Sequence, residues 1–262
     1  MTTTKLSVIV PILLCFLVAG AAGQTLGLSF SQPAQISSTE APFKWYPDRY
    51  PAHSLVASSN VLTESISPAD FQTPAMGSET SFYNTQGYKF DVIPGTTSVS
   101  ILVYIPSTWE LLPERLAGFW ATAVNSTYVV GNDYPIVEFQ GPITSELPGP
   151  GYYPNGGVAG FYGWDNTANG GNGGWDYIGL PTNFKYNSYV LLTMSLSNGQ
   201  FTYSVANSAG ADGVSITSPL YDPTEAFIGN VILEGYNYNA PNSIKWKTLK
   251  ASFNSDSQII WN

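Results

Sequence analysis

The sequence predicts an all-β protein, a two-sheet antiparallel jelly-roll sandwich. Apolar and polar residues alternate with a period of two from about residue 80 onward, as in residues 98–105. Turn signals such as Asn198-Gly199 separate the alternating runs. Helix patterns are scarce, and the best candidate, residues 108–116, contains Pro113. Many strands joined by turns, without a repeating strand–helix–strand order, favour two antiparallel sheets packed face to face.

The expected strands follow one another with few interruptions. After residues 98–105, the Gly-, Pro- and Asn-rich stretch 141–175 predicts long loops around a short strand at 158–164. Residues 189–196 and 201–205 form the two arms of a hairpin. The last strands are expected at 226–238 and at 244–253, where Lys245 and Lys247 alternate with apolar residues.

The first 23 residues read as a secretory signal peptide. Lys5 precedes a short apolar run at 8–18, and small residues at 19–23 suit a signal peptidase. The run is too short for a comfortable membrane span. We therefore expect a secreted, extracellular protein with no membrane insertion after cleavage. Residues 24–42 are expected to form a flexible lead-in, and residues 43–262 a single β-jelly-roll domain. The only cysteine, Cys15, lies in the signal, so the mature chain has no disulfide.

Charge and composition narrow the ligand classes. The 262-residue chain has a net charge of −9, which becomes −10 when Lys5 is removed with the signal. Such a surface disfavours nucleic acid, anionic lipid and polyanionic polysaccharide, the last unless calcium bridges the charges. Charged residues make up 10% of the chain and aromatic residues 14%. This composition suits a sheet that stacks rings on neutral sugars, although other secreted β-sandwiches share it.

Several segments carry a resemblance to a known superfamily: residues 45–50, 82–88, 104–109, 115–120, 134–139 and 230–237. Together they resemble secreted proteins with a concanavalin A-like lectin/glucanase jelly roll, of the laminin-G-like sort, over residues 43–254. The resemblance implies the jelly-roll fold. It leaves function open, because this superfamily contains lectins, glycoside hydrolases, polysaccharide lyases and adhesion modules.

Glu138 and Glu234 are the candidate catalytic residues, because glycoside hydrolysis needs two carboxyl groups that flank the scissile bond. Each glutamate falls on the polar face of a predicted strand. Segments 134–139 and 234–236 resemble the two glutamate motifs of the small jelly-roll xylanases, although the Ser-Ser-Gly that usually follows the second is absent. The Glu-x-Asp-x-x-Glu motif of laminarinase-type enzymes is also absent. The other interpretation is that both glutamates make structural hydrogen bonds.

Aromatic and amide side chains form the candidate ligand-binding set. On the strand that carries Glu234, the same face is expected to present Asn230, Tyr236 and Tyr238. A second group surrounds the Gly- and Asn-rich segment and is our candidate for sugar stacking: Tyr152, Tyr153, Tyr162, Trp164, Trp175 and Tyr177. The alternative for Trp164 and Trp175 is that they close the edge of the sandwich.

Other motifs give weaker signals. Asp165 and Asp176, with asparagines between them, offer oxygen ligands for calcium, the only metal that the sequence suggests; otherwise no cofactor is expected. A lyase site would need basic residues, but His53 is the only histidine, and Arg49 and Arg115 are expected to pair with acids other than their sequence neighbours. Asn125 begins a glycosylation sequon, Asn-Ser-Thr.

We therefore expect a secreted carbohydrate-binding, lectin-like module for a neutral glycan or polysaccharide. Two alternatives stay open: a glycoside hydrolase that uses Glu138 and Glu234, and a structural or adhesive extracellular protein. An enzyme is the less favoured interpretation. The oligomeric state is not indicated by the sequence.

Overall fold

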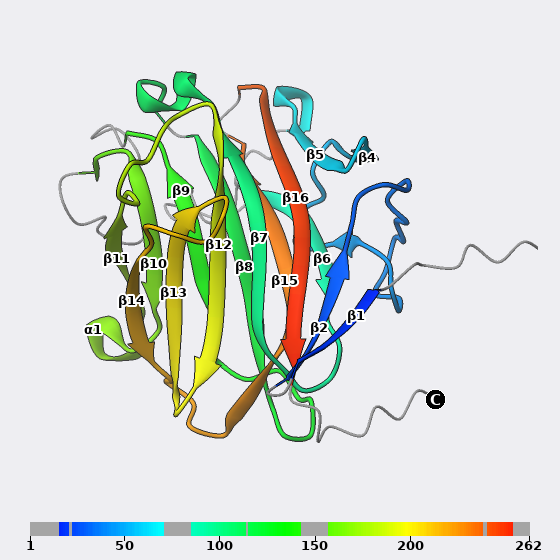
Figure 1. The fold of residues 1–262 in the computed structure, drawn as a ribbon, viewed down its shortest axis with the longest axis vertical. Coiled ribbons are helices and arrows are strands. Elements are labelled where there is room, and N and C mark those ends of the chain that lie inside the picture. Colours follow the sequence, from blue (N-terminus) through cyan, green and yellow to red (C-terminus); the bar gives the residue numbers. More distant parts are fainter. Residues whose placement is uncertain are drawn as a thin grey trace, which may run out of the picture.

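Two antiparallel β-sheets packed face to face make up the fold (Figure 1). The computed structural model describes residues 16–20, 23–70, 85–113, 115–142, 157–237 and 240–253. The prediction of an all-β, two-sheet jelly-roll sandwich is confirmed. Three short helical elements lie within the described residues: η1 (Pro68–Asp70), η3 (Ser107–Glu110) and α1 (Ala168–Gly171).

The nine-stranded sheet faces the viewer in Figure 1. Its main path runs in the order β1 (Phe16–Gly20), β2 (Gly23–Leu28), β16 (Asn242–Phe253), β7 (Thr96–Ile105), β12 (Ser188–Ser197), β13 (Gln200–Asn207) and β14 (Val214–Pro219). Beyond the part of β16 that pairs with β2, the same strand pairs with β5 (Val61–Ile66), which in turn pairs with β4 (Ser54–Ser58).

The seven-stranded sheet lies behind it. Its strands follow the order β11 (Gly174–Gly179), β10 (Gly160–Asp165), β9 (Ile136–Gln140), β8 (Leu116–Asn125), β15 (Glu225–Tyr236), β6 (Thr85–Asp91) and β3 (Tyr46–Pro47). Because sequence-distant strands such as β8 and β15 lie side by side, this sheet collects residues from most of the chain on one surface.

The core lies between the two sheets, where one side chain in two from each strand is buried. Its largest fully buried side chains include Trp246, Phe119, Phe139, Phe161 and Phe201. Burying each such side chain contributes about 1.5–3 kcal/mol to folding. The core determines which alternate residues of each strand point inward. The residues between them point to the outer faces of the sheets, and we call this alternation the parity of the strand.

Two expectations differ from the structure in detail. The helix expected at 108–116 is reduced to the 3-10 turn η3, in which Trp109 is buried, and β8 begins at Leu116. The expected lead-in 24–42 begins with β2, which pairs with β16. Within the expected signal peptide, β1 pairs with β2. The signal peptide and domain boundaries stay predictions.

A second, smaller apolar cluster lies outside the main core. It contains Trp120, Ile136 and Ile232, with Trp164 and Trp175 packed against them. Their strands, β8, β9, β10, β11 and β15, are five neighbours of the seven-stranded sheet, so the cluster covers the outer face of that sheet. Among the described residues, no helix is long and apolar enough to span a membrane.

Candidate functional site

The two candidate catalytic glutamates lie on the outer face of the seven-stranded sheet, in one row. Glu138 of β9 and Glu234 of β15 are both directly opposite Gly118 of β8, one on each side. Two strand spacings separate their backbones, or about 9–10 Å. The predicted parity explains this placement, because Val137, Phe139, Val231 and Leu233 all point into the main core.

The space over Gly118, between the two glutamates, is occupied by the indole of Trp120. A Cβ atom at position 118 would lie 2.5 Å from Trp120 Nε1 and 3.2 Å from the Glu234 Cβ. Trp120 Nε1 donates a hydrogen bond of 3.0 Å to Glu138 Oε2. The absence of a side chain at Gly118 therefore allows the indole to reach one glutamate and to pack beside the other.

Glu234 belongs to a charged network at the β3 end of the sheet. Arg49 Nη2 lies 3.8 Å from Glu234 Oε1, and Arg49 Nε contacts Asp48 Oδ2 at 3.1 Å. Lys89 Nζ contacts Asp48 Oδ1 at 2.6 Å. The expectation that Arg49 pairs with acids other than its neighbour is therefore wrong in part: residues 48–50 form a bend, not a strand, so adjacent side chains can meet.

The two acids of this network differ in protonation. Burial, together with the negative charge of Asp48, raises the pKa of Glu234 well above its usual value. Although burial opposes it, the hydrogen bonds from Glu234 and Lys89 hold the pKa of Asp48 below its usual value. The two shifts favour the neutral form of the Glu234 carboxyl and the ionised form of the Asp48 carboxyl. A neutral acid beside an ionised one is an arrangement suited to proton donation.

Both glutamates are fully buried, with no exposed surface. A sugar placed between them would have to displace the Trp120 indole. The arrangement thus supplies a protonated carboxyl and a hydrogen-bonded carboxyl on one face, but no open space between them for a substrate.

Four predicted stacking residues come together at the edge of the same face. We call Tyr162, Trp164, Trp175 and Tyr177 the aromatic platform. Trp164 is paired with Trp175 and Tyr162 with Tyr177 across β10 and β11, so all four rings share one face. The ring centroids are 5.0 Å apart in the tryptophan pair and 5.1 Å in the tyrosine pair. Tyr162 is buried and the other three rings are half-buried.

Hydrogen-bonding atoms lie on this face as well. Asn230 of β15 is paired with Thr122 of β8, and both side chains are buried. Asn230 Oδ1 and Thr122 Oγ1 have no hydrogen-bond partner among the described residues. Tyr236 shares the face of Asn230 and Glu234 and is also buried. Tyr238, Tyr152 and Tyr153 lie outside the described residues.

The calcium expectation rests on Asp165 and Asp176. Asp165 Oδ1 accepts hydrogen bonds from the Thr167 backbone, the Thr167 hydroxyl and Ser218, so this oxygen is already used within a turn. Asp176 is exposed on β11. The described residues contain no group of three or more His, Cys, Asp or Glu side chains placed to hold a metal. Calcium stays an untested expectation.

The remaining motif residues lie apart from this face or bind locally. His53 Nδ1 contacts Asp70 Oδ2 at 2.8 Å at the surface. Arg115 immediately precedes the first residue of β8. Asn125 Oδ1 accepts hydrogen bonds from Thr127 and Val129 in the turn after β8. The sequon therefore lies in a surface turn, and its glycosylation stays a prediction.

Sequence reasoning missed three residues of the site: Trp120, Gly118 and Asp48. Their signals were present, because segments 115–120 and 45–50 contributed to the resemblance. What the sequence does not give is strand order, and only the order β9–β8–β15 places Gly118 between the glutamates.

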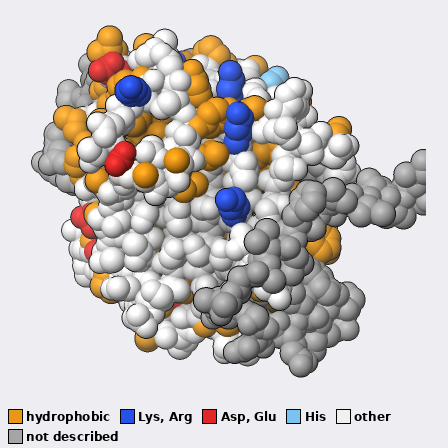
Figure 2. All heavy atoms as spheres, viewed as in Figure 1, with side chains coloured by type: hydrophobic (Ala, Val, Ile, Leu, Met, Phe, Trp, Pro, Cys, Tyr) orange, Lys and Arg blue, Asp and Glu red, His pale blue; other side chains and the backbone are white. Residues whose placement is uncertain are grey.

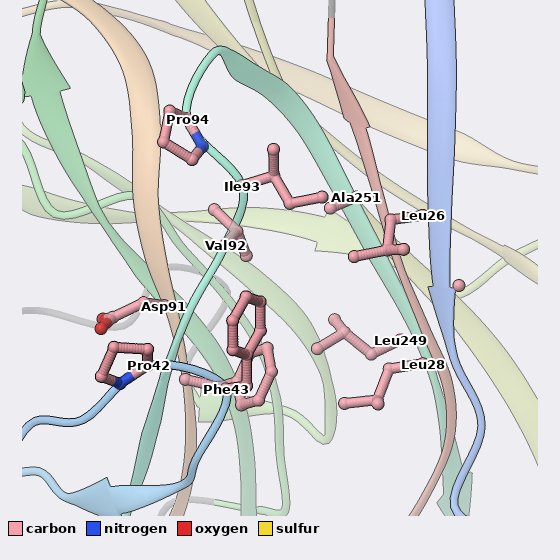
Figure 3. A pocket seen from close by; sticks show the side chains of 12 residues that line it. Leu26, Leu28, Pro42, Phe43, Asp91, Val92, Ile93, Pro94, Leu249 and Ala251 are labelled. Carbon is pink, nitrogen blue, oxygen red and sulfur yellow. The ribbon is translucent and has the colours of Figure 1, made fainter. Parts of the chain in front are cut away.

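A separate pocket of about 230 Å³ lies at the edge of the sandwich, near β2, β16 and the segment after β6 (Figure 3). Its walls are almost entirely apolar, from side chains such as Leu26, Leu28, Phe43, Ile93 and Leu249. None of the predicted site residues lines it, so it does not contribute to the site described above.

Comparison with known proteins informs the fold. SCLam, a non-specific endo-β-1,3(4)-glucanase from family GH16, superposes with a TM-score of 0.56 at 8% identity, covering 92% of this chain and 95% of that chain. The chain has the concanavalin A-like jelly-roll fold. The catalytic domain of an endo-1,3-β-glucanase (laminarinase) from Thermotoga petrophila RKU-1 gives 0.52 at 9% identity, covering 94% and 100%.

A third solved structure is the CBM2 module of the evolved Dit of Lactobacillus casei BL23 phage J-1, with a TM-score of 0.50 at 10% identity, covering 89% and 98%. No protein-family model and no curated protein matches the chain. At such low identities the structural likeness concerns the fold alone.

Proposed function

We propose that this protein binds a neutral polysaccharide on the outer face of its seven-stranded sheet. The observation that carries the proposal is the aromatic platform, with three half-buried rings on two neighbouring strands of the same face. Ring faces stack on the apolar surface of a sugar. The unpartnered atoms of Asn230 and Thr122 are buried in the same sheet and offer hydrogen-bonding capacity for an enclosed water molecule beneath this face.

We propose a β-1,3-linked or mixed β-1,3(4)-linked glucan as the first ligand to test. Two proteins with the same fold are described as glucanases of these linkages. The low content of charged residues, 10% of the chain, favours a neutral glycan over a charged one at this face. Export to the extracellular space, where such polymers occur, is part of the proposal and rests on the signal-like first 23 residues.

Affinity electrophoresis in gels containing laminarin or mixed-linkage glucan tests this function. The parent protein should be retarded in proportion to the polymer concentration. Trp175→Ala should raise the apparent Kd about tenfold, because a stacked ring contributes on the order of 1 kcal/mol beyond its buried area. Melting temperatures of both proteins should be measured in parallel.

Tyr177→Ala and Tyr128→Ala form a matched pair for this test. Tyr177 belongs to the aromatic platform, whereas Tyr128 is 45% exposed in the turn after β8 and stacks on Phe227 of β15, outside the platform strands β10 and β11. Tyr177→Ala should weaken binding and Tyr128→Ala should not. Equal retardation of the two variants, or of parent and Trp175→Ala, would contradict the proposal and favour a structural or adhesive role.

A hydrolase is the second candidate, favoured by the position of Glu234 and Glu138 on either side of Gly118 and by the raised pKa of Glu234. A glycosidase needs one carboxyl held neutral as an acid and a second one on the same face. Glu234 and Glu138 meet this condition, provided that the Trp120 indole moves when a substrate binds.

Release of reducing sugar from the same glucans tests the hydrolase. Glu234→Gln should lower the rate by at least about a hundredfold, as loss of a general acid does. Glu225→Gln is the matched control, because Glu225 is another buried glutamate of β15 and lies nine residues away at the far end of the strand. Parent protein that releases no sugar, or equal rates in the two variants, would exclude the Glu138/Glu234 mechanism.

A further inference from the structure

A row of three lysines lies on the outer face of the nine-stranded sheet, on the opposite side of the molecule from the aromatic platform. We call Lys245, Lys247 and Lys250 of β16 the lysine row. Ile244, Trp246 and Leu249, which alternate with them, are buried in the main core, so the lysines point outward. Figure 2 shows basic side chains in a column over this face.

A β-bulge brings the third lysine into the row. In a regular strand, Lys250 would point to the opposite side from Lys245 and Lys247, because parity changes with every residue. The register with β7 shifts between Lys247 and Lys250, and Thr248 there has a φ of 48°. The three lysines consequently lie opposite Tyr104, Leu102 and Ser100, every second residue of β7.

This geometry gives an even spacing of about 7 Å between neighbouring lysines along the strand. A positive φ is strongly disfavoured for a β-branched residue, so Thr248 holds the bulge at a cost in stability. Bulges of this kind re-aim side chains and often mark functional positions. The even spacing of the lysine row is thus produced by a strained local conformation.

The face around the lysine row carries no negative charge from its strands. Of the 18 acidic residues in the sequence, only Glu64 lies in the strands of the nine-stranded sheet, and its side chain is fully buried. None of the three lysines forms an ion pair with a described residue. In a protein of net charge −9, this sheet therefore presents a local reversal of charge.

Tyrosine rings and hydroxyl groups surround the row. Lys247 Nζ lies 4.3 Å from the ring centroid of Tyr189, Lys245 Nζ lies 5.7 Å from that of Tyr104, and the two rings meet edge to face. Serine and threonine hydroxyls extend across the adjacent strands, as in the 2.7 Å contact between Ser98 and Ser195. The rings hold two ammonium groups in place, and the hydroxyls provide uncharged hydrogen-bonding groups.

We propose that the outer face of the nine-stranded sheet is a second binding site, which takes an acidic polysaccharide along the lysine row. Regularly spaced ammonium groups complement the repeated carboxylates or sulfates of such a polymer, and the hydroxyl-rich face suits its sugar units. The net negative charge disfavours polyanions of every kind on the rest of the surface, and the lysine row is a local exception to that rule. The hydroxyl groups beside the row favour sugar units over nucleic-acid bases or lipid as the rest of the ligand. This site shares no residue with the aromatic platform.

Biolayer interferometry with the intact protein, purified from its own host, tests the proposal. Binding is measured to dextran sulfate, polygalacturonate and uncharged dextran. One or both acidic polymers should bind, which distinguishes sulfate from carboxylate recognition, and uncharged dextran should not. Affinity should fall as salt rises. Lys245→Gln/Lys247→Gln should weaken binding to the acidic polymer by about tenfold or more, since it removes two of the three charges.

Lys44→Gln/Lys185→Gln is the matched control, because it removes two exposed lysines from elsewhere on the surface. It should bind the acidic polymer as the parent does. The proposal is overturned if the parent binds neither acidic polymer, if both double variants lose affinity equally, or if duplex DNA or anionic vesicles bind more tightly than the polysaccharides. Binding to neutral glucan is measured separately, so failure here leaves the aromatic platform untouched.

Discussion

At Gly118, the backbone of β8 approaches an indole nitrogen so closely that no side chain fits between them. A Cβ would lie 2.5 Å from Trp120 Nε1, well inside a normal contact. Trp120 cannot move away without loss of its hydrogen bond to Glu138 and its contact with Arg49, whose guanidinium carbon lies 5.5 Å from the ring centroid. The missing side chain at Gly118 thus leaves the space in which Trp120 contacts both Glu138 and Arg49 of the charged network.

Gly118→Ala should therefore destabilise the protein by about 1–3 kcal/mol, as overpacking of a buried site does. The displaced indole should also change the intrinsic tryptophan fluorescence of the native state. Urea unfolding followed by fluorescence and by far-UV circular dichroism measures both effects. The control is Ala57→Gly on the outer strand β4, which should lower the free energy of unfolding by a smaller amount. Gly199→Ala would not be a suitable control, because Gly199 has a positive φ that alanine disfavours. An unchanged midpoint for Gly118→Ala would show that Trp120 adapts freely.

Among the strands, β16 shows how a local conformation determines which residues reach a face. Its bulge depends on Thr248, at a φ of 48°. Thr248→Asn should stabilise the protein by about 1 kcal/mol, because asparagine tolerates this region better than a β-branched residue. Thermal unfolding should show a raised Tm.

Thr193→Asn on β12 is the comparison for this change, since Thr193 also faces outward but has no positive φ. It should lower the Tm, because asparagine is disfavoured in regular strands. If both substitutions lower the Tm equally, the conformation at Thr248 is not strained.

Strand existence and parity could be predicted from the sequence, because hydrophobic alternation reports directly on the core. The strand at 226–238 was expected with Val231 and Leu233 inward and Glu234 outward, and the structure confirms this at β15. The bulge in β16 could not be predicted, because it depends on the register with β7. Nor could the burial of Glu138 and Glu234, since it depends on which strands are neighbours and on the fit of Trp120.

For the molecule as a whole, buried carboxyl groups govern the dependence of stability on pH. Burial raises the pKa of Glu64 to about 8, although the hydrogen bond from Trp246 Nε1, 3.1 Å long, opposes the shift. Burial and the neighbouring Asp133 raise the pKa of Glu225 to about 8 as well. Each group binds a proton more tightly in the folded than in the unfolded state, so stability falls as pH rises above the unfolded value near 4.5.

We therefore expect the free energy of unfolding to decline between about pH 4.5 and pH 8, by about 1.4 kcal/mol per pH unit for each such group. Below about pH 4 it should decline too, because Asp48 has a lowered pKa and loses its partners on protonation. Urea unfolding from pH 3 to pH 9 measures this profile. Glu64→Gln should flatten the alkaline side, whereas Glu40→Gln, at an exposed position, should leave it unchanged. A parent profile that rises from pH 5 to pH 8 would contradict the assignment.

The uneven placement of charge also has a consequence for how the molecule approaches other bodies. Three of the nine basic residues stand on the outer face of the nine-stranded sheet, whose strands contain a single acidic residue, the buried Glu64, and this placement contributes a component of an electric dipole across the thickness of the sandwich. In the field of a matrix of the acidic polysaccharide proposed above, such a dipole would exert a torque on the molecule before contact. The protein would arrive with one side already turned toward the matrix, leaving the opposite side free to face the surrounding fluid.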